Sequence, residues 1–293
     1  MPSNGKLQRI AMWSIVVALG IFALKLAAWW LTDSVALFSD AMESVVNVVA
    51  SCVAWYALRI AHTPADDNHP FGHHKAEYFS AVLEGVLIVV AALLIIHEAW
   101  TVLFDPRLLD APVLGLLVNG LAAVGNGLWA WLLISTGRKA RSPAMVADGK
   151  HLWTDVVTSA GVILGLVLAV ATGWYWLDPV MALVVAVNIL WHGWHLVGDS
   201  VQGLMDVSVE PEELARIERV IADNDDGALE FHDLKTREAG RARFIEFHLV
   251  VPSQMTVESA HRICDRIEGA LAKAQPGAEV TIHVEPEHKA KFC

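Results

Sequence analysis

Long apolar blocks occupy roughly the first two thirds of this chain, and the remainder is polar. Six blocks are each roughly 20 residues or longer, the length a helix needs to cross a hydrocarbon core of about 30 Å. They lie at about residues 10–31, 35–58, 81–103, 113–134, 145–171 and 179–197. The pattern predicts a bundle of six transmembrane helices.

The sequence changes character at Asp206, where the apolar runs become short and charged residues, Gly and Pro become frequent. Helical spacing or a helix-starting proline indicates helices over residues 210–222 and 257–274. Strands are indicated over residues 228–236, 242–251 and 279–284. We therefore expect a membrane domain over residues 1–205 and a small α/β domain, ordered α-β-β-α-β, over residues 206–293.

Composition supports a membrane protein and excludes other classes. Of the 293 residues, 55% are hydrophobic, and the mean hydropathy is +0.46. The formal charge of -11 falls mostly on the polar region, which argues against a nucleic-acid partner. No nucleophile elbow, phosphate-binding loop or dinucleotide fingerprint is present, so we expect neither an enzyme nor an organic cofactor.

The distribution of basic residues predicts the orientation in the bilayer. Lys and Arg fall before the first block, between the second and third, and between the fourth and fifth, whereas acidic residues predominate in the other connections. Because cytoplasmic connections carry the excess of Lys and Arg, both termini and the polar domain should be cytoplasmic.

Two polar pairs interrupt the apolar blocks at helical spacing. Glu43 and Asn47 lie in the second block, and His151 and Asp155 lie in the fifth. Residues four apart share one face of a helix. At 1.5 Å per residue, each pair lies about 13 to 20 Å from the end at which its block enters the membrane, so both should reach the midplane.

These four side chains predict a site for a divalent transition metal. An imidazole, two carboxylates and an amide oxygen suit zinc, cobalt, nickel or iron better than calcium or magnesium. Asp40, one turn before Glu43, is a candidate second-shell or alternative ligand. Asp148 and Glu84 look more like members of a polar network. The alternative for the whole cluster is an interhelical hydrogen-bond network that holds two helices together.

The connection between the second and third blocks is dense in histidine and aspartate. It reads Asp66-Asp-Asn-His69-Pro-Phe-Gly-His73-His. Such a composition favours a metal site. The alternative is a turn whose Asp and Asn cap the next helix while the histidines are solvated.

Three stretches, Ser39–Asn47, Asp66–Glu77 and Asp148–Asp155, together with the acidic tail domain, resemble the cation diffusion facilitator family of divalent-metal/proton antiporters. The likeness is greatest to its bacterial zinc and iron efflux branch and covers nearly the whole chain. Members that move zinc or iron commonly have Asp or His where Glu43 stands and Asp where Asn47 stands. This chain therefore has one carboxylate fewer.

The resemblance implies three metal sites and a metallochaperone-like tail. The transport site falls on Glu43, Asn47, His151 and Asp155, and the loop site on Asp66, His69 and His73. The tail site falls on His232, His248, His261, His283 and Glu285. A charge pair of Lys75 and Asp206 would couple the two domains.

The implied activity is proton-coupled efflux by a homodimer in the bacterial inner membrane. Zinc is the leading cargo, with cobalt, iron, nickel, manganese or cadmium as further candidates. Two other readings remain: a membrane-bound metal sensor with a structural membrane domain, and a passive channel. A closed midplane site favours alternating access over a continuous pore.

Overall fold

The computed structural model describes residues 4–32, 35–104, 113–172, 174 and 176–291. The side chains of Asp40 and Glu43 lie outside the described part. The chain divides into two compact units, Met1–Val201 and Gln202–Cys293.

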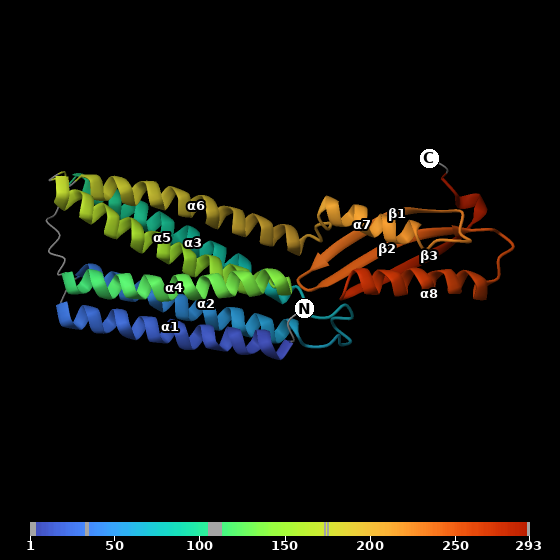
Figure 1. Cartoon of the computed structure of the whole chain (residues 1–293), viewed down its shortest axis with the longest axis horizontal. Helices are drawn as coiled ribbons and strands as arrows, with labels where there is room; N and C mark the ends of the chain where they lie inside the picture. Colours follow the sequence, from blue (N-terminus) through green and yellow to red (C-terminus); the bar gives the residue numbers. More distant parts are fainter. Residues whose placement is uncertain (1–3, 33–34, 105–112, 173, 175, 292–293) are drawn as a thin grey trace. The chain divides into compact units, whose positions relative to one another are not determined.

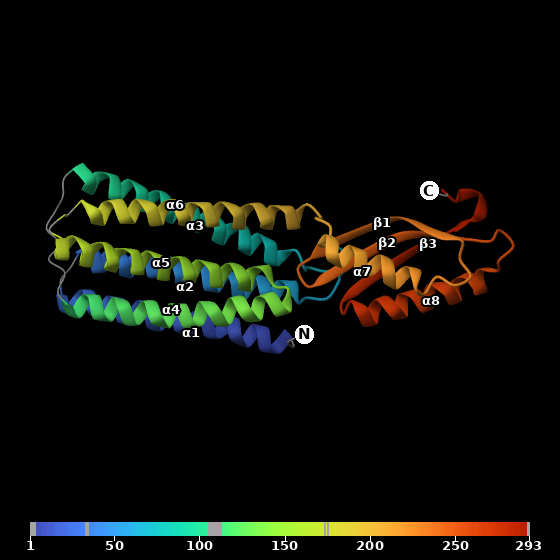
Figure 2. The same ribbon diagram turned by 45° about the horizontal axis from the view of Figure 1, so that its top comes forward.

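Six long helices make up the described part of the first unit, and each contains one of the six apolar blocks. They are α1 (Asn4–Thr32), α2 (Val35–Ala61), α3 (Ala76–Phe104), α4 (Val113–Ala140), α5 (Pro143–Thr172) and α6 (Leu177–Leu204). The helices lie alongside one another in both ribbon views (Figures 1 and 2).

Two stretches of the described residues are long and apolar enough to cross a membrane by length and composition. These stretches are Gly5–Ala27 in α1 and Ala76–Thr101 in α3. The first half of α5 carries Asp148, Lys150 and Asp155, and such charges lower the hydropathy of a segment. Six membrane spans therefore stay a prediction, although six helices are present.

Helix α5 joins two clusters of buried apolar residues. Ala144, Met145 and Leu152 pack in a cluster with residues of α1, α2 and α4. Ala147, on another face of α5, packs with residues of α3 and α6. Figure 2 shows α5 between the α3–α6 pair and the remaining helices. Polar residues on α5 can therefore contact several helices at once.

Two glycines allow α3 and α6 to approach closely. A Cβ on Gly85 would lie 2.7 Å from Val197 Cγ2, and a Cβ on Gly193 would lie 2.8 Å from Ile88 Cγ2. Small residues of this kind let helix backbones pack tightly in membrane bundles.

The second unit has the element order predicted from the sequence. Its elements are α7 (Pro211–Ala222), β1 (Glu230–Ala239), β2 (Ala242–Val251), α8 (Val257–Ala274), β3 (Ala278–Pro286) and a 3-10 helix, η1 (Glu287–Lys289). The strands form one mixed sheet in the order β1-β2-β3, with β1 antiparallel and β3 parallel to β2.

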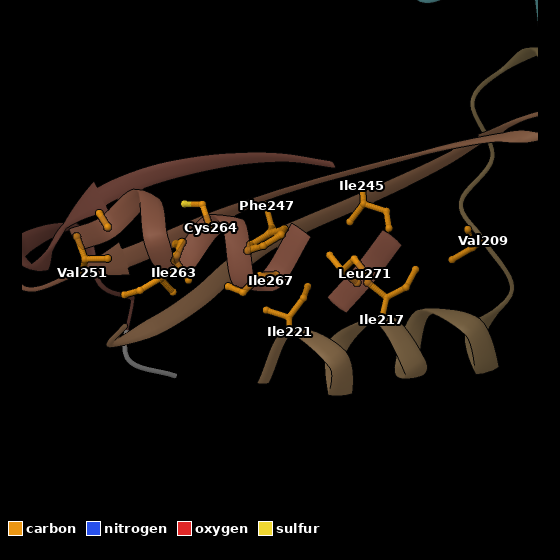
Figure 3. Packing of buried hydrophobic residues seen from close by; sticks show 12 residues of the cluster. Val209, Ile217, Ile221, Ile245, Phe247, Val251, Ile263, Cys264, Ile267 and Leu271 are labelled. Carbon is orange, nitrogen blue, oxygen red and sulfur yellow. The ribbon is translucent and has the colours of Figure 1, made fainter. Parts of the chain in front are cut away.

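Both helices of this unit pack on one face of the sheet. Ile217 and Ile221 of α7 and Ile263, Ile267 and Leu271 of α8 are buried together with alternate residues of β2, as Figure 3 shows. The Thr256 hydroxyl accepts a hydrogen bond from Ser259 N (3.2 Å) and caps α8. Because successive side chains of a strand point to opposite faces, the other residues of β2 lie on the face away from α7 and α8.

A bulge in β1 changes the alternation at one point. His232 is paired with His248 but Lys235 is paired with Glu246, so β1 holds one residue more than β2 over this interval. Asp233 has a φ of 53°, a left-handed conformation that Asp tolerates better than most residues. The bulge therefore redirects the Asp233 side chain.

Candidate metal centres

Asn47 of α2 and His151 and Asp155 of α5 meet inside the helical unit. The Asn47 amide donates a hydrogen bond to Asp155 Oδ2, and His151 Nε2 lies 2.7 Å from Asn47 Oδ1. Since a carbonyl oxygen only accepts, His151 carries a hydrogen on Nε2 in this arrangement. The three side chains are 3%, 3% and 6% exposed. We call them the α2–α5 cluster.

The cluster brings together the part of the expected transport site that the structure describes. The i, i+4 spacing of His151 and Asp155 places both on the face of α5 that meets α2. Among the described residues, His151 Nδ1 is buried and has no hydrogen-bond partner. The side chains of Glu43 and Asp40 lie outside the described part, so their predicted roles are still predictions.

A second polar layer lies one helical turn away. Ser51 Oγ donates to Asp148 Oδ1 at 3.1 Å, and Ser80 Oγ donates to Glu84 Oε1 at 3.0 Å. Ser51 follows Asn47 by four residues on α2, and Asp148 precedes His151 by three on α5. Sequence patterns indicated network roles for Asp148 and Glu84, but not their hydroxyl partners.

The loop between α2 and α3 gathers its three predicted ligands. His69 Nδ1 lies 3.2 Å from Asp66 Oδ1, and His73 Nε2 lies 3.4 Å from Asp66 Oδ2. The two imidazole rings are 4.3 Å apart between centroids. One ligand atom from each residue can lie within 4.8 Å of the others, which suits a single metal ion.

Asp66 also organises the turn itself. Its Oδ1 accepts hydrogen bonds from Asn68 N (3.0 Å) and His69 N (2.7 Å). The backbone hydrogen bond from His69 is the chief cause that lowers the pKa of Asp66. The carboxylate therefore stays ionised in mildly acidic solution. Turn formation and metal binding are compatible here, because Oδ2 remains directed at His73.

In the tail, one histidine from each strand forms a row across the sheet. His232 of β1 pairs with His248 of β2, which pairs with His283 of β3. The ring centroids are 5.3 Å apart for His232 and His248, and 4.9 Å for His248 and His283. This row lies on the sheet face opposite α7 and α8, because His248 alternates with the buried Phe247 and Leu249.

Two carboxylates border the row. Glu285 Oε2 lies 3.3 Å from His232 Nε2, and Glu285 Oε1 lies 3.4 Å from His248 Nδ1 and 3.7 Å from His283 Nε2. Asp233, redirected by the bulge, lies 3.9 Å from His248 Nδ1 through Oδ2 and completes a potential ligand group with His232 and His248. A hydrogen bond from Lys291 is the chief cause that lowers the pKa of Asp233.

Two of the expected tail residues have other partners. His261 lies on α8, and its Nε2 is 3.6 Å from Asp265 Oδ1. Asp206 Oδ1 accepts a hydrogen bond from Arg237 Nη1 at 3.2 Å. Lys75 belongs to the other unit, so its pairing with Asp206 stays a prediction, as does the role of His261 in metal binding.

Comparison with known proteins identifies both parts of the chain. Residues 11–205 match the model of the cation efflux transmembrane domain, and residues 209–287 match that of the cation efflux protein cytoplasmic domain. An uncharacterized transporter of Synechocystis, sll1263, is 47% identical over 276 residues, which are 94% of this chain and 89% of the relative. The cation-efflux pump FieF of Pectobacterium atrosepticum is 34% identical over 276 residues, or 94% and 91%.

Among solved structures, the zinc form of CzrB is 54% identical to the part of the chain that it matches. It covers 29% of this chain and 96% of its own, with a TM-score of 0.28.

Proposed function

This chain belongs to the cation diffusion facilitator family of cation efflux transporters, and from that premise we propose that it exports divalent transition-metal cations from the cytoplasm in exchange for protons. Zinc is the first candidate cargo. The observation that carries the proposal is the convergence of Asn47, His151 and Asp155 from two helices at a buried position. Relatives named cation-efflux pumps support the direction of transport.

The hydrogen bonds of the α2–α5 cluster are the contacts that a metal ion would replace. Metal binding requires an ionised carboxylate and an imidazole nitrogen with a free lone pair, so a cation and protons compete for the same groups. Asn47 would supply a neutral oxygen, and Glu43 a second carboxylate. His151 and Asp155 are then the proposed proton carriers at this site, and an inward proton gradient drives the cation outward.

Membrane orientation follows from the charge pattern of the sequence. With six spans and cytoplasmic termini, α2 descends from the periplasmic side and α5 rises from the cytoplasm, and their pairs meet near the midplane. Transport then proceeds by alternating access to one fixed site.

The direct test is cation uptake into liposomes or inverted membrane vesicles under an imposed pH gradient. Zinc uptake that follows the gradient, and stops when a protonophore abolishes it, supports exchange. Zinc uptake at the same rate with and without the pH gradient would contradict proton coupling. Unitary currents in electrophysiology would indicate a channel, because a carrier turns over too slowly to produce them. Zinc binding without transport would favour the alternative function, a membrane-bound metal sensor.

Substituting aspartate for Asn47 should change the preferred cation. The variant adds a carboxylate and removes the amide that donates to Asp155, so the site becomes more negative and binds more protons when empty. We expect the apparent affinity for zinc at neutral pH to change by about tenfold relative to cobalt and manganese, with a steeper pH dependence. Metal-by-metal uptake between pH 6 and 8 provides the measurement.

The matched control is Asn126→Asp, which introduces a carboxylate at a buried asparagine of α4 outside the cluster. An equal change of preference in both variants would show that general bundle charge, and not the cluster, sets selectivity.

We propose that the row of histidines in the tail, His232, His248 and His283, binds regulatory metal. Metal binding there would stabilise a homodimer and favour transport when cytoplasmic metal rises, because a ligand shifts the equilibrium toward the state that binds it better. The central position of His248 between His232 and His283 makes it the residue to test.

We expect His248→Ala to weaken zinc binding by the tail by about 100-fold or more, since even the loss of a second-shell partner costs 10- to 100-fold. Chelator competition on a fragment covering residues 206–293 measures this affinity. His288→Ala, which removes an exposed histidine of η1, should bind zinc like the parent fragment. Similar affinities for the parent and His248→Ala would exclude the histidine row as the tail site.

A further inference from the structure

The polar layer beside the α2–α5 cluster contains two carboxylates that the proposed transport site does not use. Glu84 of α3 is 0% exposed and Asp148 of α5 is 2% exposed, and the two are near enough for their charges to interact. Among the described residues, neither forms an ion pair with Lys or Arg. Two buried carboxylates without a counter-charge do not both stay ionised.

Hydrogen bonding distinguishes the two groups. Asp148 interacts with two hydroxyls, from Ser51 of α2 and Ser14 of α1. These donors favour its ionised form and oppose the effect of burial, which favours the protonated form. Glu84 receives one hydroxyl, from Ser80 on its own helix. Its other oxygen, Oε2, is buried and has no hydrogen-bond partner in the described part of the chain.

Apolar residues pack on the part of α3 that carries Glu84. The α6 residues that pack on this part of α3 are Ile189 and Leu196, together with Ala147 of α5. Besides Asp148, the titratable group that faces this layer from α5 is His151, one turn further along the helix. Nothing on α3 or α6 supplies a positive charge among the described contacts of Glu84.

We propose that Glu84 is a proton-binding site of the transporter. It holds a proton in the metal-free conformation, with Asp148 ionised, and releases that proton when a cation enters the neighbouring cluster. The arrangement favours this coupling through Asp148, whose charge interacts with that of Glu84 and which lies about one helical turn from His151 on α5. A divalent charge acts strongly on buried groups at such short range. The O–H bond of Glu84 breaks, the proton passes to water, and Glu84 is left as a carboxylate. This inference rests on the proposed function, since it assigns a further group to the same proton exchange.

The test counts protons released when zinc binds to the full-length protein. Purified protein in detergent is mixed with zinc chloride in weakly buffered solution that contains a pH indicator. We expect Glu84→Gln to bind zinc and to release about one proton fewer per ion than the wild type. In infrared difference spectra, zinc should remove the carbonyl absorption of protonated carboxylic acids from the wild type, and the component that belongs to Glu84 should be missing from this change in the variant.

Glu77→Gln is the matched control, because Glu77 is a buried carboxylate of the same helix that accepts a hydrogen bond from Ser142. It should keep the wild-type proton count and band. A Glu84→Gln variant with both features unchanged overturns the inference, whereas wild-type protein that binds zinc without transporting it contradicts only the proposed function.

Ser80→Ala provides a second variant that retains the acid. It removes the hydroxyl donor to Glu84, so zinc-induced proton release should move to higher pH. An unchanged pH profile overturns the inference even where Glu84→Gln does not fold.

Discussion

Replacing Asp155 by alanine is expected to reduce zinc transport by about 100-fold or more, because the variant removes a charged ligand from the proposed cation site. Asp155 is the carboxylate of the α2–α5 cluster in the described part of the chain, and it accepts a hydrogen bond from the Asn47 amide. Without it, a divalent cation would face His151 and a neutral amide, with Glu43 as its remaining proposed carboxylate. Zinc uptake into liposomes at fixed pH gradient provides the measurement.

The variant must be compared at equal amounts of folded protein. Asp199→Ala serves as the control, since Asp199 is an exposed carboxylate on α6. It should transport zinc at the wild-type rate. A conservative Asp155→Asn variant tests charge separately from shape, and it too should be inactive. Normal transport by Asp155→Ala would remove the α2–α5 cluster as the transport site.

Replacing Arg243 by alanine should destabilise the tail by about 3–5 kcal/mol, the usual cost of breaking a buried ion pair. The Arg243 guanidinium contacts both carboxylate oxygens of Glu213 on α7. It also donates to Glu238 Oε1 of β1 at 2.8 Å and to the Gln275 side chain at the end of α8. Its removal leaves two carboxylates without their shared cation.

Burial by itself would lower the pKa of Arg243, but hydrogen bonds to Glu213 and Glu238 outweigh burial and raise it. The residue is therefore charged throughout the pH range in which the tail is folded. Arg243→Lys should recover part of the lost stability, because an ammonium keeps the charge but lacks the planar fork that contacts Glu213 twice.

Urea unfolding of the fragment that covers residues 206–293 measures the effect. Arg262→Ala is the control: Arg262 pairs with Glu258 on the exposed surface of α8, and such pairs contribute about 0–1 kcal/mol. A loss of less than about 1 kcal/mol in Arg243→Ala would show that the contacts around it are incidental.

The elements of this chain were largely predictable because their periodicity is strong. Each apolar block of the first unit lies within a long helix, and the bounds predicted for β2 and α8 match those observed. The helices extend past the apolar blocks. Helix α4 continues through Arg138 and Lys139, and α6 continues through Asp199 to Leu204. Hydropathy alone marks the apolar part of a helix and not its polar ends.

Contacts between elements were less predictable. The sequence grouped Asn47 with His151 and Asp155 at one membrane depth, but depth does not determine helix rotation, so the hydrogen bonds among the three needed the structure. The bulge that brings Asp233 beside His248 contains no glycine, so the sequence does not predict it. The partners of Arg243 also needed the structure, because a sequence pattern does not show which carboxylates surround a charge.

The row of histidines crosses every strand pairing of the tail sheet. A cation bound by His232, His248 and His283 would cross-link the edge strand β3 to β2 and β1 through side chains, in addition to the backbone hydrogen bonds of the sheet. Chelation should therefore loosen β3 first. Amide hydrogen exchange in residues 278–286 should then quicken well before the helices open, so the exchange rate of this outer strand should report how much metal the tail holds.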